Sequence, residues 1–427
     1  MNAPEPGVRR PGARTPSVAV LMELMRTPHA GGQVKCWERL AEAAAELEPD
    51  ELGVDLTVYV LGPRPGLHPL SPAVRFVALR PVVSTAPLTR HGGVDASDLA
   101  PWRPLLARRL RQQHDVWHLT HLFAFAGTAV RLRRSSRAGL VASVHTDVPE
   151  LATAFLGGRS AAAGRLAGTV LRRRRDRLLR ACDHTLVAEP EQRAELASVV
   201  GAHRVSLLGR GVDRGRFHAD ASARAAFLRR HDVPPGRTLV LFAGRADASK
   251  RVLLLTEAVR RLLARGRRVQ LLVAGDGPDA SRVADRLGTA ATLLGVLPQE
   301  ELALAYAASD VLAFPSRSET VGNVVGEALA CGLPVVLPAG ARTVRWLAAP
   351  GADGVVVEDD TAGGWAAALG RLVDDPALRA AIAERAAATG RERLRTWTEV
   401  LTEDLLPVWR AVTPPVLLPP VAPSPRP

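Results

Sequence analysis

The stretch Val311-Leu-Ala-Phe-Pro-Ser-Arg-Ser-Glu-Thr-Val-Gly-Asn-Val-Val-Gly-Glu-Ala-Leu-Ala-Cys-Gly-Leu-Pro-Val-Val-Leu337 contains two short apolar runs with a polar loop and a helical pattern between them. The runs Val311–Pro315 and Pro334–Leu337 have the length and the proline or glycine boundaries of buried strands. Val324–Ala330, between them, reads as a helix. This order of strand, helix and strand is the repeating unit of a parallel sheet.

The same alternation continues in both directions along the chain. In the first half the expected strands are Ser17–Leu24, Asp55–Leu61, Val74–Leu79, Val116–Thr120, Leu140–His145 and Thr185–Ala188. In the second half they are Thr238–Ala243, Val269–Ala274, Thr292–Val296, Val311–Pro315, Pro334–Leu337 and Gly354–Val357. Helices are expected between them, including Val34–Leu47, Leu122–Arg134, Val252–Arg265 and Glu300–Ala308. The pattern predicts an α/β fold with two parallel-sheet domains.

The stretch 209–235, rich in Gly, Asp and Pro, is expected to hold the hinge between the two series. The predicted organisation is a disordered tail at 1–16, an N-terminal domain at 17–215, a C-terminal domain at 216–395, a helical segment at 396–413 and a Pro-rich tail at 414–427. The segment Trp397–Trp409 has an apolar stripe at helical spacing. Two alternatives remain open for it: packing on its own domain, or crossing back to the first domain.

The composition of the 427 residues is that of a soluble globular protein, with 47% hydrophobic residues. No window approaches the roughly 18 apolar residues of a membrane span, and the start lacks the apolar core of a secretory signal. Three distant cysteines, Cys36, Cys182 and Cys331, form no disulfide or zinc pattern. We therefore expect a cytoplasmic protein.

The net charge is +13, yet only Lys35 and Lys250 are lysine and all other basic residues counted in this charge are arginine. A positive surface attracts phosphates or anionic lipids, but an arginine-rich codon bias explains part of this charge. The two remaining lysines are more informative, because such a bias replaces any lysine for which arginine can substitute.

A candidate anion site follows the strand Thr238–Ala243, since ligands of open parallel sheets bind beyond the carboxyl ends of the strands. Arg245 and Lys250 stand there at the entry to a helix. Two such cations repel each other unless an anion lies between them. A diphosphate fits, with arginine binding as a fork and lysine as a point charge. The alternative is a pair of exposed cations.

Two carboxylates, Glu319 and Glu327, follow the strand that begins at Val311. On one continuous helix they would lie about 12 Å apart along the axis and about 80° apart around it, which is a poor pair. With Glu319 in a loop and Glu327 in the second turn, both face one ligand and accept hydrogen bonds from sugar or ribose diols.

The start of the same helix adds a second candidate for phosphate binding. The backbone amides of Gly322, Asn323 and Val324 form its positive end. The structural alternative for Glu319 and Glu327 is a surface acid and a first-turn acid.

Further candidates follow other strands. Gly31 and Gly32 precede the first helix and allow close approach of a phosphate or sugar. His145 ends the strand that begins at Leu140. Gly275 opens a G-x-G-x-x-A match, but Pro278 interrupts it and no acid ends the next strand, which disfavours a nicotinamide site.

The remaining histidines are less informative. For His118 and His121, at the end of another strand, a structural role is at least as plausible as a ligand contact. His114 is expected at the surface. Structural roles also remain open for the glycine pair and for His145.

Together these motifs resemble the retaining glycosyltransferases of family 4, closest to the branch of mannosyl- and sulfoquinovosyl-type transferases. The resemblance spans about Ser17 to Val412. Its most specific part is Glu319-x7-Glu327, supported by FAGR with Lys250, GDGP at 275–278, RGVD at 210–213, HTD at 145–147 and Gly31-Gly32. It implies the GT-B fold, in which two Rossmann-like domains face each other across a cleft.

The resemblance also implies roles for single residues. Arg245 and Lys250 would bind the donor diphosphate and stabilise it as it leaves. Glu319 would hold donor-sugar hydroxyls, and Glu327 the ribose hydroxyls. His145 would support an oxocarbenium-like transition state. Such enzymes generally need no metal or other cofactor, because cationic side chains and helix amides take that electrostatic role.

Implied contacts with the donor extend to Gly31, Gly32 and Gly275, and to Gly322, Asn323 and Val324 at the helix start. Three positions depart from the family pattern. Arg251 stands where the family favours glycine, Val321 where phenylalanine is frequent, and Gln33-Val-Lys35 follows the glycine pair. These departures leave the diphosphate site intact and the acceptor open. Lys35 either reaches an acidic acceptor or is a solvated helix residue.

The segment Arg159–Arg180 carries the run Arg172–Arg175 among apolar residues. It reads either as a solvated helix face or as a basic amphipathic helix in peripheral contact with the inner face of the membrane. The acceptor is accordingly a lipid, a polyprenyl carrier or a soluble natural-product core.

The leading hypothesis is transfer of a hexose from a nucleotide sugar to a hydroxyl acceptor. A nucleotide-sugar epimerase or hydrolase is the alternative enzyme. An arginine-rich nucleic-acid-binding protein is disfavoured, because aromatic residues are only 4% and no base-stacking cluster is visible.

Overall fold

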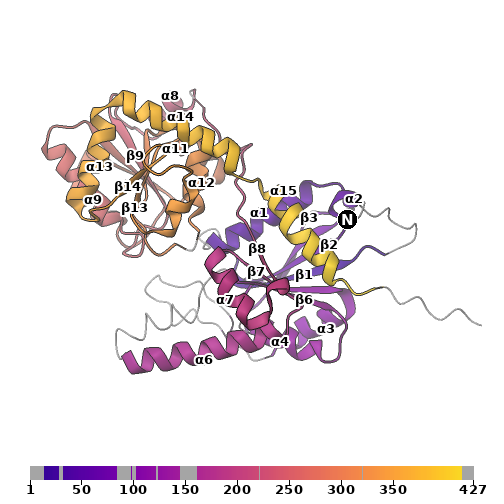
Figure 1. Cartoon of the computed structure of the whole chain (residues 1–427). Coiled ribbons are helices and arrows are strands. Elements are labelled where there is room, and N and C mark those ends of the chain that lie inside the picture. Colours follow the sequence, from indigo (N-terminus) through magenta and orange to yellow (C-terminus); the bar gives the residue numbers. More distant parts are fainter. Residues whose placement is uncertain are drawn as a thin grey trace, which may run out of the picture. The chain divides into compact units, whose positions relative to one another are not determined.

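The computed structural model describes residues 14–27, 32–83, 98, 102–121, 124–144, 161–220, 222–319 and 321–415 (Figure 1). The chain divides into two compact units. The first unit runs to Leu208 and resumes at Leu401, and the second unit is Gly209–Val400.

The first unit contains an eight-stranded sheet with the order β3-β4-β2-β1-β5-β6-β7-β8. Its strands are β1 (Ser17–Met25), β2 (Asp55–Leu61), β3 (Gly66–Ser71), β4 (Val74–Leu79), β5 (Val116–Leu119), β6 (Gly139–Val144), β7 (His184–Val187) and β8 (Val205–Leu207). All neighbours pair in parallel except β3, which forms an antiparallel pair with β4. The strand order reverses between β1 and β5, as in a doubly wound fold.

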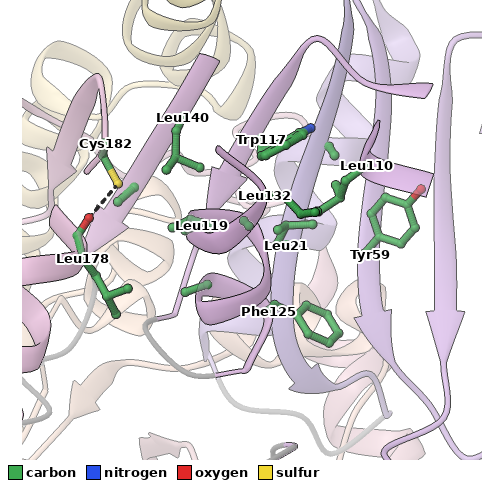
Figure 2. Close-up of a cluster of buried hydrophobic side chains, with 14 of the residues drawn as sticks. Leu21, Tyr59, Leu110, Trp117, Leu119, Phe125, Leu132, Leu140, Leu178 and Cys182 are labelled. Carbon is green, nitrogen blue, oxygen red and sulfur yellow. Dashed lines mark hydrogen bonds between the residues drawn. The ribbon is translucent and has the colours of Figure 1, made fainter. Parts of the chain in front are cut away.

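The helices of the first unit are α1 (Gly32–Glu46), α2 (Pro49–Leu52), α3 (Pro104–Gln113), α4 (Ala124–Arg133), α6 (Ala161–Arg180), α7 (Pro190–Val200), the 3-10 turn η2 (Ala202–Arg204) and α16 (Leu406–Val412). Alternate strand residues point to opposite faces of the sheet. On one face Leu21, Trp117 and Leu140 pack with Phe125 of α4 in the core that Figure 2 shows. Cys182 belongs to the same core, and its thiol donates a hydrogen bond to the carbonyl of Leu178 at 3.4 Å.

On the opposite face, the C-terminal segment packs against the sheet of the first unit. The side chain of Trp409 is fully buried, and its Nε1 donates to Nδ1 of His118 at 3.0 Å. Trp37 of α1 meets the same imidazole edge to face. Burial lowers the pKa of His118 to about 3, so this histidine is a neutral part of the core. The chain reaches α16 through α15 (Trp397–Val400) and a π-helical turn, Leu401–Leu405.

The second unit contains a six-stranded, wholly parallel sheet with the order β11-β10-β9-β12-β13-β14. Its strands are β9 (Thr238–Ala243), β10 (Val269–Ala274), β11 (Ala291–Gly295), β12 (Val311–Ala313), β13 (Val335–Pro338) and β14 (Val355–Val357). Counted along the chain this order is third, second, first, fourth, fifth and sixth, which is the order of a Rossmann fold.

Helices cover both faces of this sheet, and each face has its own core. One core joins the sheet to α9 (Val252–Ala264), α10 (Ala280–Leu287) and α13 (Ala362–Asp374). The other joins it to α8 (Ala223–Arg230), α11 (Gln299–Ala308), α12 (Asn323–Ala330) and α14 (Pro376–Arg393). The 3-10 turns η3 (Gly288–Ala290) and η4 (Arg342–Trp346) complete the unit.

The predicted α/β class with two parallel sheets is confirmed, and every predicted strand is present to within two residues at either end. Two strands were not predicted. β3 is an antiparallel edge strand that contains Pro69, and β8 has only three residues. The expectation for His114 was wrong, because this side chain is buried between Ser17 and Tyr59 and bonds to both.

Candidate functional site

The predicted cations and carboxylates of the second unit meet at the switch point of its sheet. The order of strands reverses between β9 and β12, and ligands of such sheets bind beyond the carboxyl ends of the strands at this point. Arg245 and Lys250 follow β9, and Glu319 and Glu327 follow β12. The structure therefore brings the two motifs to one edge of one sheet.

Lys250 and Glu319 form a direct ion pair between Nζ and Oε1. The hydroxyl of Ser316, which is fully buried, donates to the same carboxylate oxygen at 2.7 Å. Both charged side chains are more than four-fifths buried, so solvent and salt screen this pair less than an exposed one. Glu319 is held by a cation from one loop and a hydroxyl from its own loop.

Arg245 pairs with Asp247, with 2.8 Å between Nε and Oδ2, while its side chain remains 46% exposed. The other oxygen of Asp247 accepts from the amide and hydroxyl of Ser249 and from the amide of Lys250. Burial acts to raise the pKa of Asp247, but these hydrogen bonds and Arg245 outweigh it and lower the pKa.

This arrangement corrects the sequence argument about mutual repulsion of the two cations. An ionised Asp247 sits in the loop that carries Arg245 and Lys250, and Glu319 pairs with Lys250. Each cation therefore has its own carboxylate, and an anion between the cations is not required for this loop to form.

Helix α12 begins directly after Gly322, whose φ is 72°. A Cβ at this position would lie 2.4 Å from Cγ2 of Thr343, so both backbone conformation and space require glycine. Asn323 and Val324 occupy the first turn, Glu319 lies in the preceding loop and Glu327 in the second turn. This is the placement of the two carboxylates that the sequence analysis described, one in the loop and one in the second turn.

Glu327 accepts a hydrogen bond from the phenol of Tyr306 of α11, at 3.0 Å on Oε2. Tyr306 is fully buried, and this burial, together with the nearby Glu327 carboxylate, raises its pKa well above the ordinary value. The phenol therefore keeps its proton and acts as a donor. Nothing in the local sequence identified this partner, because it comes from the preceding helix.

Gly275 has a structural reason for being glycine. Its φ is 137°, and a Cβ would lie 1.9 Å from the carbonyl oxygen of Gly244. The loops after β9 and β10 are joined backbone to backbone, with Ala246 N donating to the carbonyl of Asp276 at 3.0 Å. A contact of Gly275 with a donor remains a prediction.

Arg251 is the N-cap of α9 and has left-handed backbone angles, φ 59° and ψ 32°. For a residue with a Cβ this conformation costs about 1–2 kcal/mol. This is the departure from the family's glycine that the sequence showed, and the structure explains the preference for glycine there.

In the first unit the structure describes only some of the predicted site residues. Gly31 and His145 lie outside the described residues. Gly32 begins α1, and no atom lies within 4 Å of the place that a Cβ would take. Lys35 is paired on its own helix with Glu38, at 3.0 Å between Nζ and Oε2.

The sequence reasoning missed Glu23, a fully buried carboxylate in β1. Its two oxygens accept from the amides of Ala124 and Phe125, at 2.6 and 3.1 Å, at the start of α4. Burial raises its pKa to about 8, with Asp98 adding to this effect, although the two amides and Arg103 oppose it. The Met-Glu-Leu-Met run offered no signal beyond an acid inside an apolar strand.

Two surface hollows of about 500 and 530 Å³ lie elsewhere. One lies between α9 and α13 and the other at the amino ends of β1, β2 and β4, and neither includes a predicted site residue. Within the part of the chain that the structure describes, no three or more His, Cys, Asp or Glu side chains are grouped as metal ligands. The same part contains no helix long and apolar enough to cross a membrane.

Two family models match the chain. Residues 30–216 match a model described as Glycosyltransferase Family 4, and residues 237–375 one described as Glycosyl transferases group 1. Among curated relatives, a D-inositol 3-phosphate glycosyltransferase of Xylanimonas cellulosilytica is 30% identical over 89% of this chain and 94% of its own length. A GDP-mannose-dependent alpha-mannosyltransferase of Mycobacterium tuberculosis is 36% identical over 52% of this chain and 55% of its own length.

Among solved structures, the sucrose-phosphate synthase of Thermosynechococcus elongatus superposes with a TM-score of 0.68 at 22% identity, over 93% of this chain and 99% of that one. At this identity the likeness concerns the fold, which is of the GT-B class. None of these relatives is named as an epimerase or a nucleic-acid-binding protein, so the two alternatives to sugar transfer have no support.

Proposed function

Because the chain belongs to the family 4 glycosyltransferases, which transfer sugars from nucleotide sugars, we propose that it moves a hexose from a nucleotide diphosphate sugar to a hydroxyl acceptor, using the cluster between β9 and β12. The observation that carries this proposal is the ion pair of Lys250 with Glu319 at the switch point, with Arg245 in the same loop as Lys250 and paired to Asp247. A diphosphate requires cations, and sugar hydroxyls require acceptors such as carboxylates.

Arg245 and Lys250 are proposed to bind the diphosphate. The guanidinium pairs through Nε with Asp247, and the side chain is 46% exposed, so a phosphate in solution can reach it. The ammonium of Lys250 has three N–H donors and uses one of them in its hydrogen bond to Glu319. When the glycosidic bond breaks, negative charge grows on the leaving diphosphate. Cations already held in place stabilise this charge without reorganisation.

The two carboxylates are proposed to bind the carbohydrate parts of the donor. Glu319, held beside Lys250, would accept hydrogen bonds from the donor sugar next to the diphosphate. Glu327, oriented by Tyr306, would accept from the ribose hydroxyls. Between them, the amides at the start of α12 lack acceptors within the helix. Those of Asn323 and Val324, together with Gly322, are proposed to contact phosphate oxygens.

The remaining roles rest on the family resemblance. Gly31 and Gly32 are proposed to approach the donor phosphate, Gly275 to line the donor site, and His145 to support the transition state. Retention of configuration and independence from a metal are also part of this proposal.

Helix α6 supports a proposal of peripheral membrane contact. Leu166 and Val170 are exposed one turn apart, and the arginines Arg172, Arg173 and Arg174 that follow are exposed as well. Arg175 is different, because it is buried and pairs with Asp176 and Glu195. An apolar pair followed by exposed cations fits an anionic lipid surface. The acceptor would then be a lipid, and a soluble hydroxyl compound is the alternative.

The function is tested in two steps with the purified chain. Thermal-shift measurements with UDP-, GDP-, ADP- and dTDP-sugars identify the donor, and stabilisation by one of them is expected. Product analysis with a labelled donor then follows, with and without acceptors, beginning with D-inositol 3-phosphate and anionic lipid vesicles. Label transferred to an acceptor supports the proposal. Loss of label to water or a changed sugar, at equal rates with and without acceptor, contradicts it.

A further inference from the structure

Arg251 occupies a backbone conformation that glycine adopts at no cost, and its side chain makes contacts that glycine lacks. Among the described residues, Arg251 and Asp232 alone combine a side chain with a positive φ. Positions of this kind persist only when the surrounding contacts hold them. The contacts of the Arg251 side chain therefore hold this conformation in place.

The guanidinium of Arg251 joins three segments of the second unit. Its Nη1 donates to the carbonyl of Pro315 at 3.2 Å and to Oδ2 of Asp360 at 2.7 Å. Pro315 lies in the loop after β12, and Asp360 lies between β14 and α13. The start of α9 is thereby fastened to both.

Asp360 is the centre of this network. It also accepts from Arg317 on Oδ2 at 2.7 Å and from the indole of the buried Trp365 on Oδ1 at 2.9 Å. Burial acts to raise the pKa of Asp360, but the bonds from Arg251, Trp365 and Arg317 outweigh it and lower the pKa. An ionised carboxylate at this point holds both arginines.

The loop from Pro315 to Glu319 is thus held by two consecutive residues. Lys250 pairs with Glu319 at one end, and Arg251 bonds to Pro315 at the other. We propose that Arg251 and Asp360 form a positioning pair that sets the loop carrying Glu319 against Lys250. This inference rests on the proposed role of Glu319 in donor binding. In this proposal the pair holds the loop and makes no contact with the donor itself.

The test uses Arg251→Gly, which relieves the left-handed strain while removing the side-chain contacts. We expect the midpoint of thermal unfolding to change little, because these two effects oppose each other. Turnover of the nucleotide-sugar donor should fall about tenfold, in kcat more than in KM, since a 1 Å misplacement costs up to a hundredfold. The Kd for UDP or GDP, whichever binds, should stay within threefold of the wild type.

Four further variants separate positioning from plain stability. Arg251→Lys keeps one cationic contact and should recover part of the lost kcat. Asp360→Asn should lower kcat by about as much as Arg251→Gly. In the double variant kcat should fall no further than in the less active of the two single variants, because both substitutions remove the same contact. Arg267→Ala is the matched control, since it removes an exposed arginine–aspartate pair of the same unit, and its kcat should equal that of the wild type.

The outcomes distinguish the proposed function from the positioning pair. A wild-type chain that binds none of the nucleoside diphosphates contradicts the proposed function, and the positioning pair falls with it. An active wild type together with an unchanged kcat in Arg251→Gly overturns the pair alone. The pair is also overturned if kcat in every variant, including Arg267→Ala, merely tracks the unfolding midpoint.

Discussion

The two sheets end differently at their switch points. In the second unit, between β9 and β12, the edge carries Arg245, Lys250 and Glu319 in partly exposed ion pairs. In the first unit, between β1 and β5, the described residues place one carboxylate, Glu23, fully out of solvent beneath the start of α4. A switch point of the same kind thus supports, in one unit, a charged edge that suits an anionic ligand and, in the other, a buried acid that accepts hydrogen bonds from the protein's own backbone.

Removal of the Glu319 carboxylate should give the largest effect, because it acts at the charged edge itself. In Glu319→Ala we expect donor turnover to fall about a hundredfold or more, as for other losses of a group that stabilises the transition state. The Kd for the nucleoside diphosphate should change little. Steady-state kinetics and calorimetry measure both, and near-normal turnover would refute this role of Glu319.

Lys250→Ala should weaken nucleoside diphosphate binding about 10- to 100-fold, the equivalent of a lost charged hydrogen bond. It also leaves Glu319 without its cation, so turnover should fall too. Calorimetric titration gives the Kd, and circular dichroism checks that the fold persists. Arg267→Ala serves as the control for loss of a surface cation. If the wild type, Lys250→Ala and Arg267→Ala bound the nucleoside diphosphate with equal affinity, the charged edge of the second unit would not be its binding site.

Gly322→Ala tests the helix start at the charged edge. A positive φ and a Cβ 2.4 Å from Thr343 should destabilise the chain by about 1–3 kcal/mol. Chemical denaturation measures the change. As the matched variant, Gly32→Ala at the start of α1 meets open space and should change stability by much less. Equal stability of the two variants would contradict the left-handed backbone at Gly322.

Tyr306→Phe should have a smaller effect, because it removes one hydrogen bond to Glu327 and leaves the ring in place. We expect about a fivefold loss of nucleoside diphosphate affinity, equivalent to roughly 1 kcal/mol. Glu327→Ala should exceed this loss. If Tyr306→Phe instead weakened binding more than Glu327→Ala, the phenol would have to contact the ligand itself.

Glu23 gives an effect of a different kind, a pH dependence of stability in the first unit. The unfolded carboxyl loses its proton near 4.5 and the folded one near 8. Between these values the folded state binds more protons, so stability should fall as pH rises, by at most about 1.4 kcal/mol per pH unit. Denaturation of the wild type and of Glu23→Gln from pH 5 to 8 measures this slope. A Gln variant with the wild-type slope would exclude Glu23 as its source.

The sequence predicted the strands well where the apolar runs were long and bounded by glycine or proline. β3 was not predicted, because a proline and exposed leucines are not typical of a buried strand. β8 was not predicted, because three residues are too few to show the alternating pattern of a strand. The position of Glu319 before α12 and of Glu327 in its second turn followed from the spacing of the two acids. The helix start was predicted to within one residue.

The partners of these residues could not be predicted in the same way. Tyr306 reaches Glu327 and Asp360 reaches Arg251 only through the fold, because the residues of each pair come from different elements. Ser316 is a local partner of Glu319, but only the conformation of their loop brings its hydroxyl to the carboxylate. Arg251 shows the limit most clearly. The sequence marked it as unusual, but its left-handed backbone and its bond to Asp360 are features of the folded chain alone.

The most direct measurement is a crystal structure of the chain with UDP or GDP bound. We expect the diphosphate oxygens within hydrogen-bonding distance of the guanidinium of Arg245 and the ammonium of Lys250, with the ribose against Glu327. A nucleotide found anywhere else, with Lys250 and Glu327 untouched, would contradict the assignment of the donor site.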